Sequence, residues 1–564
     1  MKQQKKIVVI GGTACGPKAA ARARRCDPEA RITLVEQGKR ISTTTCGLPY
    51  YISGVSDSQS DMVAIQLDRF MDITNVDVMI RTMASAIDRK SHRVETRSGK
   101  SDRVSYIEYD KLVLATGSVP AVLALPGANL QGILTLTGVE DARTIRNLIS
   151  PNEIDKVVII GAGLIGLEMA EAFTFMGMKV TVIEALGWVL PSLLDFEVAA
   201  HVERHLHTKG VDFLPEQCVI GFEGDESGWV RKIITTNIEI EARLVLLALG
   251  VRPNISLAQN AGLDIGSTGG ISINEYLQTS DPDIYAGGDC VENINRITKQ
   301  KMLAPMGSTA NKHGRVIGTN VTGGNETFPG VLGTAIAKLF DYNVGRVGLS
   351  ELQARNAGYD VITCLAPGHE YAFFYPDGKD ILVKLVVDKS SKRILGGQVV
   401  GPGDSAKRVD VLATALTFGA TFYDIDNLDL AYAPPYNRAM DVLHDAASVL
   451  KNIYSGLAKS ITPMELKDKI DNRDDFILLD VRDPDEWEMC SIEAAQTRKI
   501  ALRELWAKLD QLPQDAEIIT LCRFGVRAYQ AQRILEGYGY KNVRFVDGSI
   551  VAWPYEVAGT KPLE

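Results

Sequence analysis

The sequence of 564 residues predicts an α/β protein built from several domains. Two short β-branched runs, at 7–10 and 157–160, each lead into a glycine-rich turn and then into a helix-forming stretch. From about residue 461 to the C-terminus, short strand-like and helix-like segments alternate. A chain of this length exceeds what one hydrophobic core normally serves, so about three to five domains are expected.

The composition excludes some classes of partner. Hydrophobic residues make up 45%, charged residues 23%, and the net charge of -9 argues against a general binder of nucleic acids or anionic membranes. Residues 1–10 place basic residues before a four-residue apolar run that passes directly into the glycine turn, so no export signal is expected. No apolar stretch is long enough for a bilayer span. We therefore expect a cytoplasmic protein with no membrane partner.

The eight cysteines are scattered, with no C-x-x-C pair and no metal-ligand cluster, so we expect no metal. In a reducing compartment most of them should be buried thiols that behave as small hydrophobes. This is the expectation for Cys15, Cys26, Cys218, Cys290 and Cys364. Cys46 and Cys522 have unusual neighbours and are candidates for chemistry.

The first glycine turn predicts a dinucleotide site. Gly11, Gly12 and Gly16 allow a tight turn, and the helix that follows presents unpaired N–H groups to a pyrophosphate. Thr13 occupies the third position of the usual G-x-G-x-x-G pattern. The next strand ends in Glu36, twenty residues after Gly16, where a carboxylate accepts hydrogen bonds from ribose hydroxyls.

The second turn matches the full pattern through Gly161, Gly163 and Gly166, and its second strand ends in Glu184. Two dinucleotides should therefore bind. A carboxylate at Glu184 suits a free 2′-hydroxyl and repels a 2′-phosphate, which favours NADH over NADPH. A lysine or arginine brought from elsewhere in the fold is the alternative.

Three further stretches, at 109–120, 244–254 and 279–290, resemble signatures of the two-dinucleotide flavoprotein disulfide reductases, a resemblance that extends over about residues 5–450. It implies FAD and a nicotinamide as cofactors. In the first two stretches the chain would cross between the two cofactor domains, and in the third an aspartate would bind the ribityl chain of FAD. The cofactor-binding residues are then expected to include Ala115, Thr116, Gly117, Gly250, Gly288 and Asp289.

The same resemblance implies the domain layout. We expect a Rossmann-like FAD domain from 1–120 and 255–325, a Rossmann-like NAD(H) domain from 121–254, and an α+β dimerisation domain from 326–450. Beyond the reach of this resemblance, the alternation of short strands and helices predicts a linker at 451–460 and a C-terminal α/β domain at 461–564. A homodimer is the expected active unit.

Cys46 lies in STTTCGLPY, which is similar to the S-F-x-x-C-x-x-P-Y motif of the CoA-disulfide reductases, a branch that uses a single redox cysteine. The residue five places on is Tyr51, so Cys46 has no neighbouring cysteine with which to close a disulfide. A lone thiolate can still form a mixed disulfide with a substrate. In this branch coenzyme A is bound as substrate or carrier.

The resemblance also assigns contacts to coenzyme A and to the cysteine. Residues matching those that bind coenzyme A are Lys18, Arg22, Arg25, Ser42 and Thr45. A cationic helix face suits the phosphates of this ligand, although a solvated charged face is the alternative. Tyr432 matches a tyrosine that the partner subunit brings to the cysteine, or is a packing residue. A second such tyrosine is replaced by Phe374, so either Tyr375 substitutes for it or the site uses one tyrosine.

The segments 476–487, 518–535 and 543–553 resemble a rhodanese domain. Cys522 opens the loop CRFGVR, whose backbone N–H groups, with Arg523 and Arg527, should favour a thiolate or persulfide. The resemblance makes Asp480 and Arg482 a buried framework ion pair. Where rhodaneses usually have Gly-His-Ile, this chain has Cys490, Ser491 and Ile492, and Cys490 is either a bystander or a second thiol.

Together these motifs predict an NADH-driven, FAD-dependent reductase of persulfides, polysulfides or CoA disulfide. Cys46 would be its redox cysteine, and the rhodanese domain would handle sulfane sulfur. One alternative is an NADH oxidase or peroxidase that uses a cysteine sulfenic acid, but those relatives carry a histidine in the helix after the first glycine turn, and residues 13–25 contain none. The other alternative is a sulfur carrier or sensor.

Overall fold

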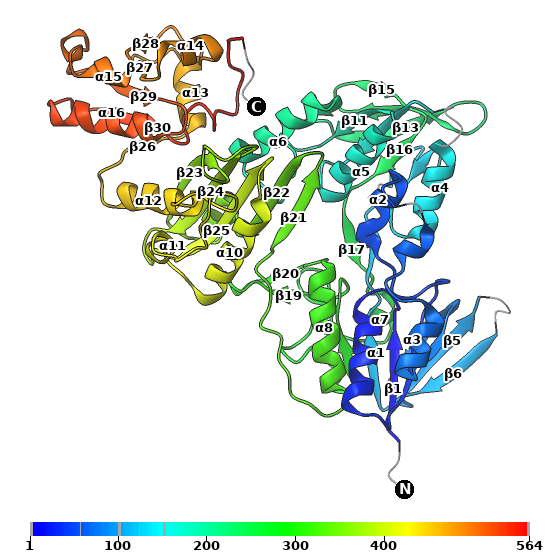
Figure 1. Ribbon diagram of the computed structural model, residues 1–564. Helices are drawn as coiled ribbons and strands as arrows, with labels where there is room; N and C mark the ends of the chain where they lie inside the picture. Colours follow the sequence, from blue (N-terminus) through cyan, green and yellow to red (C-terminus); the bar gives the residue numbers. More distant parts are fainter. Residues whose placement is uncertain (1–3, 57, 100–102, 123, 150–153, 561–564) are drawn as a thin grey trace. The chain divides into compact units, whose positions relative to one another are not determined.

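The computed structural model describes residues 4–56, 58–99, 103–122, 124–149 and 154–560 (Figure 1). The chain separates into two compact units, Met1–Ala185 with Gln217–Val331 and Leu186–Glu216 with Leu332–Glu564. Both units combine sheets with helices, and parallel sheets occur in both, which confirms the predicted α/β class.

The first sheet of unit 1 is parallel, and alternate residues of its central strand face two different cores. Ile7 and Val9 belong to a core with residues of α1 and α8, whereas Val8 and Ile10 belong to a core with residues of β4 and β5. Figure 1 shows α1 and α8 beside β1. The strand order is β18 (Ile284–Ala286), β7 (Lys111–Leu114), β1 (Lys6–Ile10), β2 (Arg31–Val35) and β3 (Asp77–Met79).

Glycines let helices α1 (Cys15–Cys26) and α8 (Gly307–Asn320) approach each other closely. A Cβ atom at Gly314 would lie 2.7 Å from the Cβ of Lys18, and one at Gly318 would lie 2.6 Å from the Cβ of Arg22. The stems of these two basic residues are therefore packed against α8, which fixes where their charged ends emerge.

The second parallel sheet of unit 1 contains β11 (Lys179–Ile183), β10 (Lys156–Ile160), β16 (Val245–Leu247) and β9 (Ile133–Leu134). Helix α5 (Leu164–Phe175) packs against β10 and β11. The antiparallel strands β8 (Ser118–Pro120) and β17 (Val251–Pro253) pair with each other. The other elements of unit 1 are η1 (Thr45–Gly47), α2 (Leu48–Ile52), η2 (Gln59–Met62), α3 (Leu67–Thr74), β4 (Thr82–Asp88), β5 (Arg93–Ser98), β6 (Val104–Glu108), α4 (Val139–Ile149), β13 (Val219–Gly224), β14 (Val230–Thr235), β15 (Glu239–Glu241), α7 (Ser256–Asn260), β19 (Asn293–Ile294) and β20 (Lys301–Met302).

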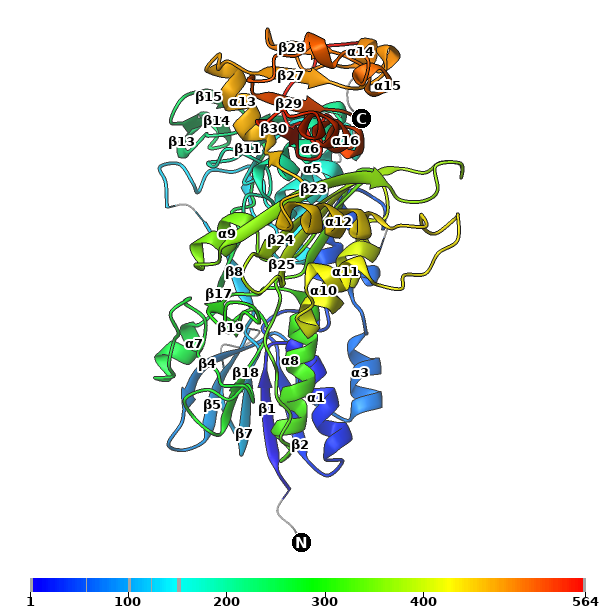
Figure 2. The ribbon, with the colours of Figure 1, turned by 90° about the vertical axis from the view of Figure 1, so that its left-hand side faces the viewer.

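Unit 2 contains an antiparallel sheet in the order β21 (Ala335–Leu339), β22 (Tyr342–Gly348), β25 (Ile394–Gly401), β24 (Asp380–Asp388) and β23 (Val361–His369). Figure 2 shows α10 and α12 beside this sheet, and the chain between β23 and β24 reaching away from it. The accompanying elements are α6 (Phe196–Thr208), β12 (Val211–Leu214), α9 (Glu351–Asn356), α10 (Ser405–Phe418), α11 (Phe422–Asp426) and α12 (Val442–Tyr454).

The C-terminal part of unit 2 is a parallel sheet with helices on both faces. Its order is β26 (Ser460–Ile461), β30 (Val543–Val546), β29 (Ile518–Leu521), β27 (Ile477–Asp480) and β28 (Thr497–Lys499). One core includes residues of α16 (Val526–Gly537) and the other includes residues of α13 (Pro463–Asp471). The short segments α14 (Pro484–Met489), α15 (Leu502–Leu505) and η3 (Leu509–Gln511) complete it.

Specific contacts attach the C-terminal sheet to the antiparallel sheet. The N–H of Leu365 in β23 donates to Asp547 Oδ2 at 3.0 Å. A Cβ atom at Gly548 would lie 2.9 Å from Leu365 Cβ. Arg204 of α6 donates to the backbone carbonyl of Trp553 at 2.9 Å. Because Asp547 and Trp553 are buried, the two sheets of unit 2 share an interior.

A buried lysine anchors α6 and α9 to the antiparallel sheet. Lys384 of β24 is 1% exposed, and its Nζ lies 3.0 Å from Asp195, 2.7 Å from Glu351 and also beside Glu197. Burial opposes the charge of Lys384, but Glu197, Asp195 and Glu351 outweigh it and raise the pKa of the lysine. The charge is therefore paired and not isolated in the core.

Candidate active site

The first glycine turn joins β1 to α1 and admits only glycine at two positions. Gly11 has a φ of +106°, and a Cβ there would lie 2.0 Å from the carbonyl oxygen of Ala115. A Cβ at Gly16 would lie 1.9 Å from the oxygen of Gly11. The N–H of Gly12 donates to Glu36 Oε2 at 2.7 Å. The carboxylate at the end of β2 thus lies at the turn, as a ribose-binding group requires.

The second turn, between β10 and α5, repeats this arrangement. A Cβ at Gly166 would lie 2.0 Å from the oxygen of Gly161, and the N–H of Ala162 donates to Glu184 Oε2 at 2.9 Å. Gly163 differs, since a Cβ there would meet no atom within 4 Å. The open space beside Gly163, at the start of α5, fits a pyrophosphate held by helix N–H groups.

The remaining expected cofactor residues lie near the first turn or the β8–β17 pair. Thr116 donates to the carbonyl of Asn254 at 2.6 Å, and Gly117 and Gly250 both face open space. Ser118 donates to Asp289 Oδ2 at 3.0 Å, and burial raises the pKa of Asp289.

A buried histidine completes this region. The N–H of Gly288 donates to Nδ1 of His313 at 3.1 Å, while His313 Nε2 is buried without a hydrogen-bond partner among the described residues. These features fit a bound dinucleotide.

Cys46 lies in the short helix η1, and its side chain is exposed. The segment before it is tied to the first glycine turn, because the N–H of Ser42 donates to the carbonyl of Gly12 at 2.6 Å. Ser42 is buried, with a φ of +54°, whereas Thr45 is exposed beside the cysteine. Of the two predicted substrate contacts in this segment, only Thr45 is accessible in the single chain.

Tyr50, four residues after Cys46, and Glu168 of α5 were not singled out by sequence reasoning. Burial raises the pKa of Tyr50, and the charges of Glu168, Glu171 and Cys46 add to the rise. Burial and the neighbouring Glu171 raise the pKa of Glu168 to about 7. An acidic side chain in the apolar helix α5 was the available signal, and Glu168 can hold or release a proton near neutral pH.

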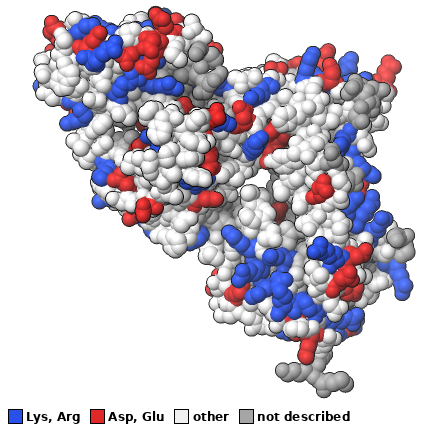
Figure 3. Space-filling model, viewed as in Figure 1, with Lys and Arg blue, Asp and Glu red and all other residues white. Residues whose placement is uncertain are grey.

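Of the three basic residues predicted on one face of α1, two are exposed and one is paired with residues outside the helix. Lys18 and Arg25 are exposed, while Arg22 lies 3.5 Å from Glu326 and donates to Thr319 at 2.9 Å. Figure 3 shows basic side chains gathered over α1 and α8. On α8 the exposed members are Lys312 and Arg315.

Cys522 follows β29 and is 1% exposed. Its Sγ accepts from the N–H of Gly525 at 3.1 Å and from the hydroxyl of Ser549 at 3.6 Å. Gly525, with a φ of +101°, is the N-cap residue directly before helix α16. These two donors face the sulfur, so they would stabilise a thiolate. Ser549 was missed because the fold brings it from the segment after β30.

The two arginines expected to stabilise the sulfur each have a carboxylate partner. Arg527 pairs with Glu486 at 2.7 Å, and this pairing, with a contribution from Cys522, raises the pKa of Arg527. Arg523 lies 3.8 Å from Asp380.

The framework pair Asp480–Arg482 is buried at 2.6 Å. Arg482 also donates to the backbone and the sulfur of the buried Cys490. This contact favours a bystander role for Cys490.

Comparison with known proteins identifies the family. The model of the pyridine nucleotide-disulphide oxidoreductases matches residues 5–307, and that of their dimerisation domain matches 334–443. The chain belongs to the pyridine nucleotide-disulphide oxidoreductases. A rhodanese-like domain matches residues 462–555. The predictions of an oxidoreductase with FAD and a nicotinamide cofactor, carrying a rhodanese domain, are thereby confirmed.

Relatives within this oxidoreductase family include reductases and oxidases. The NAD(P)H coenzyme A polysulfide/persulfide reductase of Pyrococcus horikoshii is 39% identical over 79% of this chain and 99% of its own length. The NADH oxidase of Methanocaldococcus jannaschii is 33% identical over 78% of this chain and 98% of its own. A solved NAD-dependent persulfide reductase from A. fulgidus is 42% identical, with a TM-score of 0.92 over 97% of this chain and 100% of its own.

Two of the cysteine predictions are wrong. All eight cysteines of this oxidoreductase are free, and Cys15, Cys290 and Cys364 are buried as expected. Cys26 and Cys218, however, are exposed. Cys26 is the last residue of α1, and Cys218 lies in the loop before β13, outside the strand that packs in the core.

The aromatic residues at the positions assigned to a partner subunit lie on the surface of unit 2. Tyr432 is 53% exposed and Phe374 is 63% exposed, while Tyr375 is less so. Exposed aromatic side chains of this size are available to contact a second copy.

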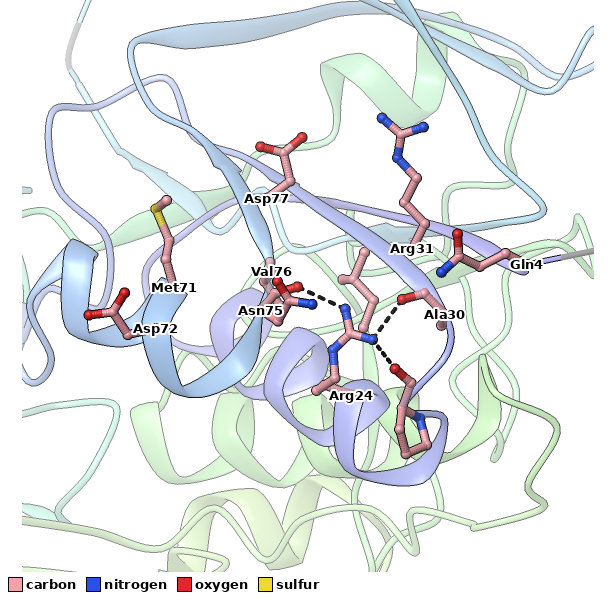
Figure 4. Close-up of a pocket in the computed structure, with 11 residues that line it drawn as sticks. Gln4, Arg24, Ala30, Arg31, Met71, Asp72, Asn75, Val76 and Asp77 are labelled. Carbon is pink, nitrogen blue, oxygen red and sulfur yellow. Dashed lines mark hydrogen bonds between the residues drawn. The ribbon is translucent and has the colours of Figure 1, made fainter.

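A hollow of about 600 Å³ opens elsewhere in unit 1 (Figure 4). Arg24 lies in it and donates to the backbone carbonyls of Ala30, Pro28 and Asn75. It opens at the amino ends of β2 and β3, whereas ligands of such sheets bind at the carboxyl ends. The hollow therefore lies at the opposite end of this sheet from the first glycine turn. Among the described helices, none has the length and apolar character needed to cross a bilayer.

Proposed function

We propose that this protein uses NADH to reduce persulfides to a thiol and hydrosulfide through Cys46. The observation that carries the proposal is that Cys46 is an exposed, unpaired thiol on a segment tied to the first dinucleotide turn. The persulfide reductases named among its relatives support this substrate class.

The reaction at Cys46 balances without a second protein thiol. The Cys46 thiolate attacks the inner sulfur of R–S–SH, forming Cys46–S–S–R and releasing HS⁻. Two electrons and one proton then divide this disulfide into the Cys46 thiolate and R–SH. Bound FAD would supply those electrons after receiving them from the nicotinamide.

The chain's own residues position the cofactors. Glu36 and Asp289 would bind the ribose and ribityl hydroxyls of FAD, and Glu184 would accept the free 2′-hydroxyl that distinguishes NADH from NADPH. The Glu184 carboxylate, which already accepts from the N–H of Ala162, would also accept hydrogen bonds from these ribose hydroxyl groups.

Two groups are suited to supply the proton to the leaving thiolate R–S⁻. Tyr432 of a second copy is one, which makes the homodimer part of the proposal. Glu168 of the same chain is the other, because its pKa of about 7 leaves it partly protonated at neutral pH and its charge acts on Tyr50, four residues after Cys46.

The group R is proposed to be coenzyme A or a related thiol. Its phosphates would meet the exposed ends of Lys18 and Arg25, with Lys312 and Arg315 nearby on α8. Cys522 would carry sulfane sulfur as Cys522–S–SH, stabilised by Gly525 N–H and Ser549.

Steady-state assays of two variants test the proposal. Cys46→Ser should keep bound FAD, seen in its absorbance, yet lose NADH-driven sulfide release from coenzyme A persulfide. Cys522→Ala is the matched control and should retain it, while losing sulfur transfer from thiosulfate. Oxygen or peroxide turnover that exceeds persulfide turnover would instead establish the oxidase found among the relatives. Full activity of Cys46→Ser would show that the nucleophile is wrong.

A further inference from the structure

The Cys522 loop lies against two residues of the β23–β24 hairpin. His369 ends β23 and Asp380 begins β24, and the two face each other across the ladder. His369 Nδ1 lies 2.5 Å from Asp380 Oδ1. The His369 ring packs edge-on against Phe524 at 5.3 Å between centroids, and Asp380 Oδ2 lies 3.8 Å from Arg523. Both residues that follow Cys522 in the chain therefore contact the hairpin.

These contacts bring a histidine to a domain that has none of its own. Residues 461–564 contain none of the seven histidines of the chain. The His369 side chain is 37% exposed, so a ligand at the loop can reach it. Sulfur transfer to a thiol needs a group that removes the S–H proton, because the thiolate is the nucleophile. Arg523 and Arg527 are permanently charged and cannot serve as bases.

The charges around His369 favour one tautomer. A carboxylate at Nδ1 holds the N–H on that nitrogen and leaves Nε2 as the basic atom. Arg523 is the cation on the Phe524 side, with its guanidinium 4.9 Å from that ring. On the neighbouring α12 side, Arg438 approaches Gly368 but pairs with Asp445 at 2.9 Å.

The other ionisable groups around His369 either accept hydrogen bonds from the backbone or line a cavity with Asp380. Glu370 accepts from the backbone N–H groups of Lys379 and Asp404. His201 and Arg204 line a small cavity of about 30 Å³ together with Asp380. Asp380 is therefore the anion paired with His369, and it also faces Arg523.

We propose that His369, oriented by Asp380, is the general base for thiol acceptors at the Cys522 persulfide. The proposal rests on the proposed role of Cys522 as a sulfane-sulfur carrier. His369 Nε2 takes the proton of R–SH, and the thiolate attacks the outer sulfur of Cys522–S–SH. The S–S bond breaks, R–S–SH leaves, and the Cys522 thiolate regains the proton from His369. The site would thus produce the persulfide that Cys46 consumes.

Two acceptors separate this role from simple packing. Cys522 is first loaded with thiosulfate and the excess is removed, and single-turnover transfer is then followed by intact mass near pH 7.5. One acceptor is 2-mercaptoethanol, which must lose an S–H proton. The other is sulfite, which has no S–H proton and returns thiosulfate. Measurements use the full chain with its FAD.

We expect His369→Gln to slow transfer to the thiol about 100-fold, which is the usual contribution of a general base, with transfer to sulfite almost unchanged. The deficit should shrink as the pH approaches the thiol pKa, where the acceptor ionises unaided. Asp380→Asn should show the same pattern with a smaller deficit. His92→Gln is the matched control, since His92 is a half-exposed histidine 3.9 Å from Asp283 in unit 1.

Equal losses with both acceptors would overturn the proposal and leave His369 a packing residue. Unchanged thiol transfer in His369→Gln would overturn it as well. If Cys522 of the unaltered protein never gains the mass of a sulfur atom, the carrier role itself fails. Failure to load Cys522 can be told apart from loss of the general base, because loading takes place before any acceptor is added.

Discussion

Asp547 places a buried carboxyl group at the junction of the two sheets of unit 2, and ionisation of this group should weaken that junction. The side chain is buried, Oδ2 accepts from Leu365 N–H at 3.0 Å, and Oδ1 has no hydrogen-bond partner among the described residues. Burial raises the pKa of Asp547 from 3.8 to about 7. The neutral acid is therefore the form that the junction prefers.

Linkage between proton binding and folding gives the sign and the size of the effect of Asp547 on stability. A raised folded-state pKa means that the contribution of Asp547 is fully present below pH 3.8 and is lost progressively as the pH rises to about 7. A shift of about three units at 1.36 kcal/mol per unit gives a limit of about 4 kcal/mol. Local opening and water penetration would reduce this limit, so we expect the stability contribution of Asp547 to be about 2 to 4 kcal/mol.

Asp547→Asn should remove this dependence, because an amide keeps the acceptor for Leu365 and stays neutral. Hydrogen exchange of the segment 361–369, read by mass spectrometry, measures the opening of the junction. Asp547→Asn should match the unaltered protein at pH 4 and be more protected by about 2 kcal/mol or more at pH 8. Asp410→Asn, an exposed site on α10, is the control. If segment 361–369 of Asp547→Asn is no more protected than that of the unaltered protein at pH 8, ionised Asp547 does not weaken the junction.

Three other outcomes are expected. Gly163→Ala should fold normally but raise the KM for NADH at least tenfold, because its methyl group enters open space at the proposed phosphate site. Gly166→Ala should instead lower the melting temperature, since its methyl group would lie 2.0 Å from the Gly161 oxygen. Glu168→Gln should remove a limb near pH 7 from the kcat profile of persulfide reduction; an unchanged profile would exclude Glu168 from proton transfer. Glu184→Ala should narrow the ratio of kcat/KM for NADH over NADPH by about tenfold, and an unaltered ratio would locate cofactor choice elsewhere.

The sequence was most informative where chemistry depends on local backbone. The turns at Gly11 and Gly161 were predictable because only glycine satisfies the positive φ and the close strand approach there. Glu36 and Glu184 were predictable because each ends a strand beside its own turn, and both meet that turn through a hydrogen bond.

Residues brought together by tertiary packing were not predictable. Glu168 acquires its raised pKa only through burial beside Glu171, and Ser549 reaches Cys522 from the segment after a different strand. His369 belongs to another sheet from the loop that it contacts. The exposure of Cys26 was mispredicted because it depends on which side of the last turn of α1 is covered.

Trapping of a mixed disulfide at Cys46 would show whether this thiol is the nucleophile. The oxidised protein is mixed with coenzyme A persulfide in the absence of NADH, quenched with acid, and its peptides are analysed by mass. We expect one coenzyme A joined to Cys46 and one hydrosulfide released per chain, and we expect the adduct to disappear when NADH is added. Cys46 found as a sulfenic acid, joined to another cysteine of the chain, or unmodified during turnover would contradict it.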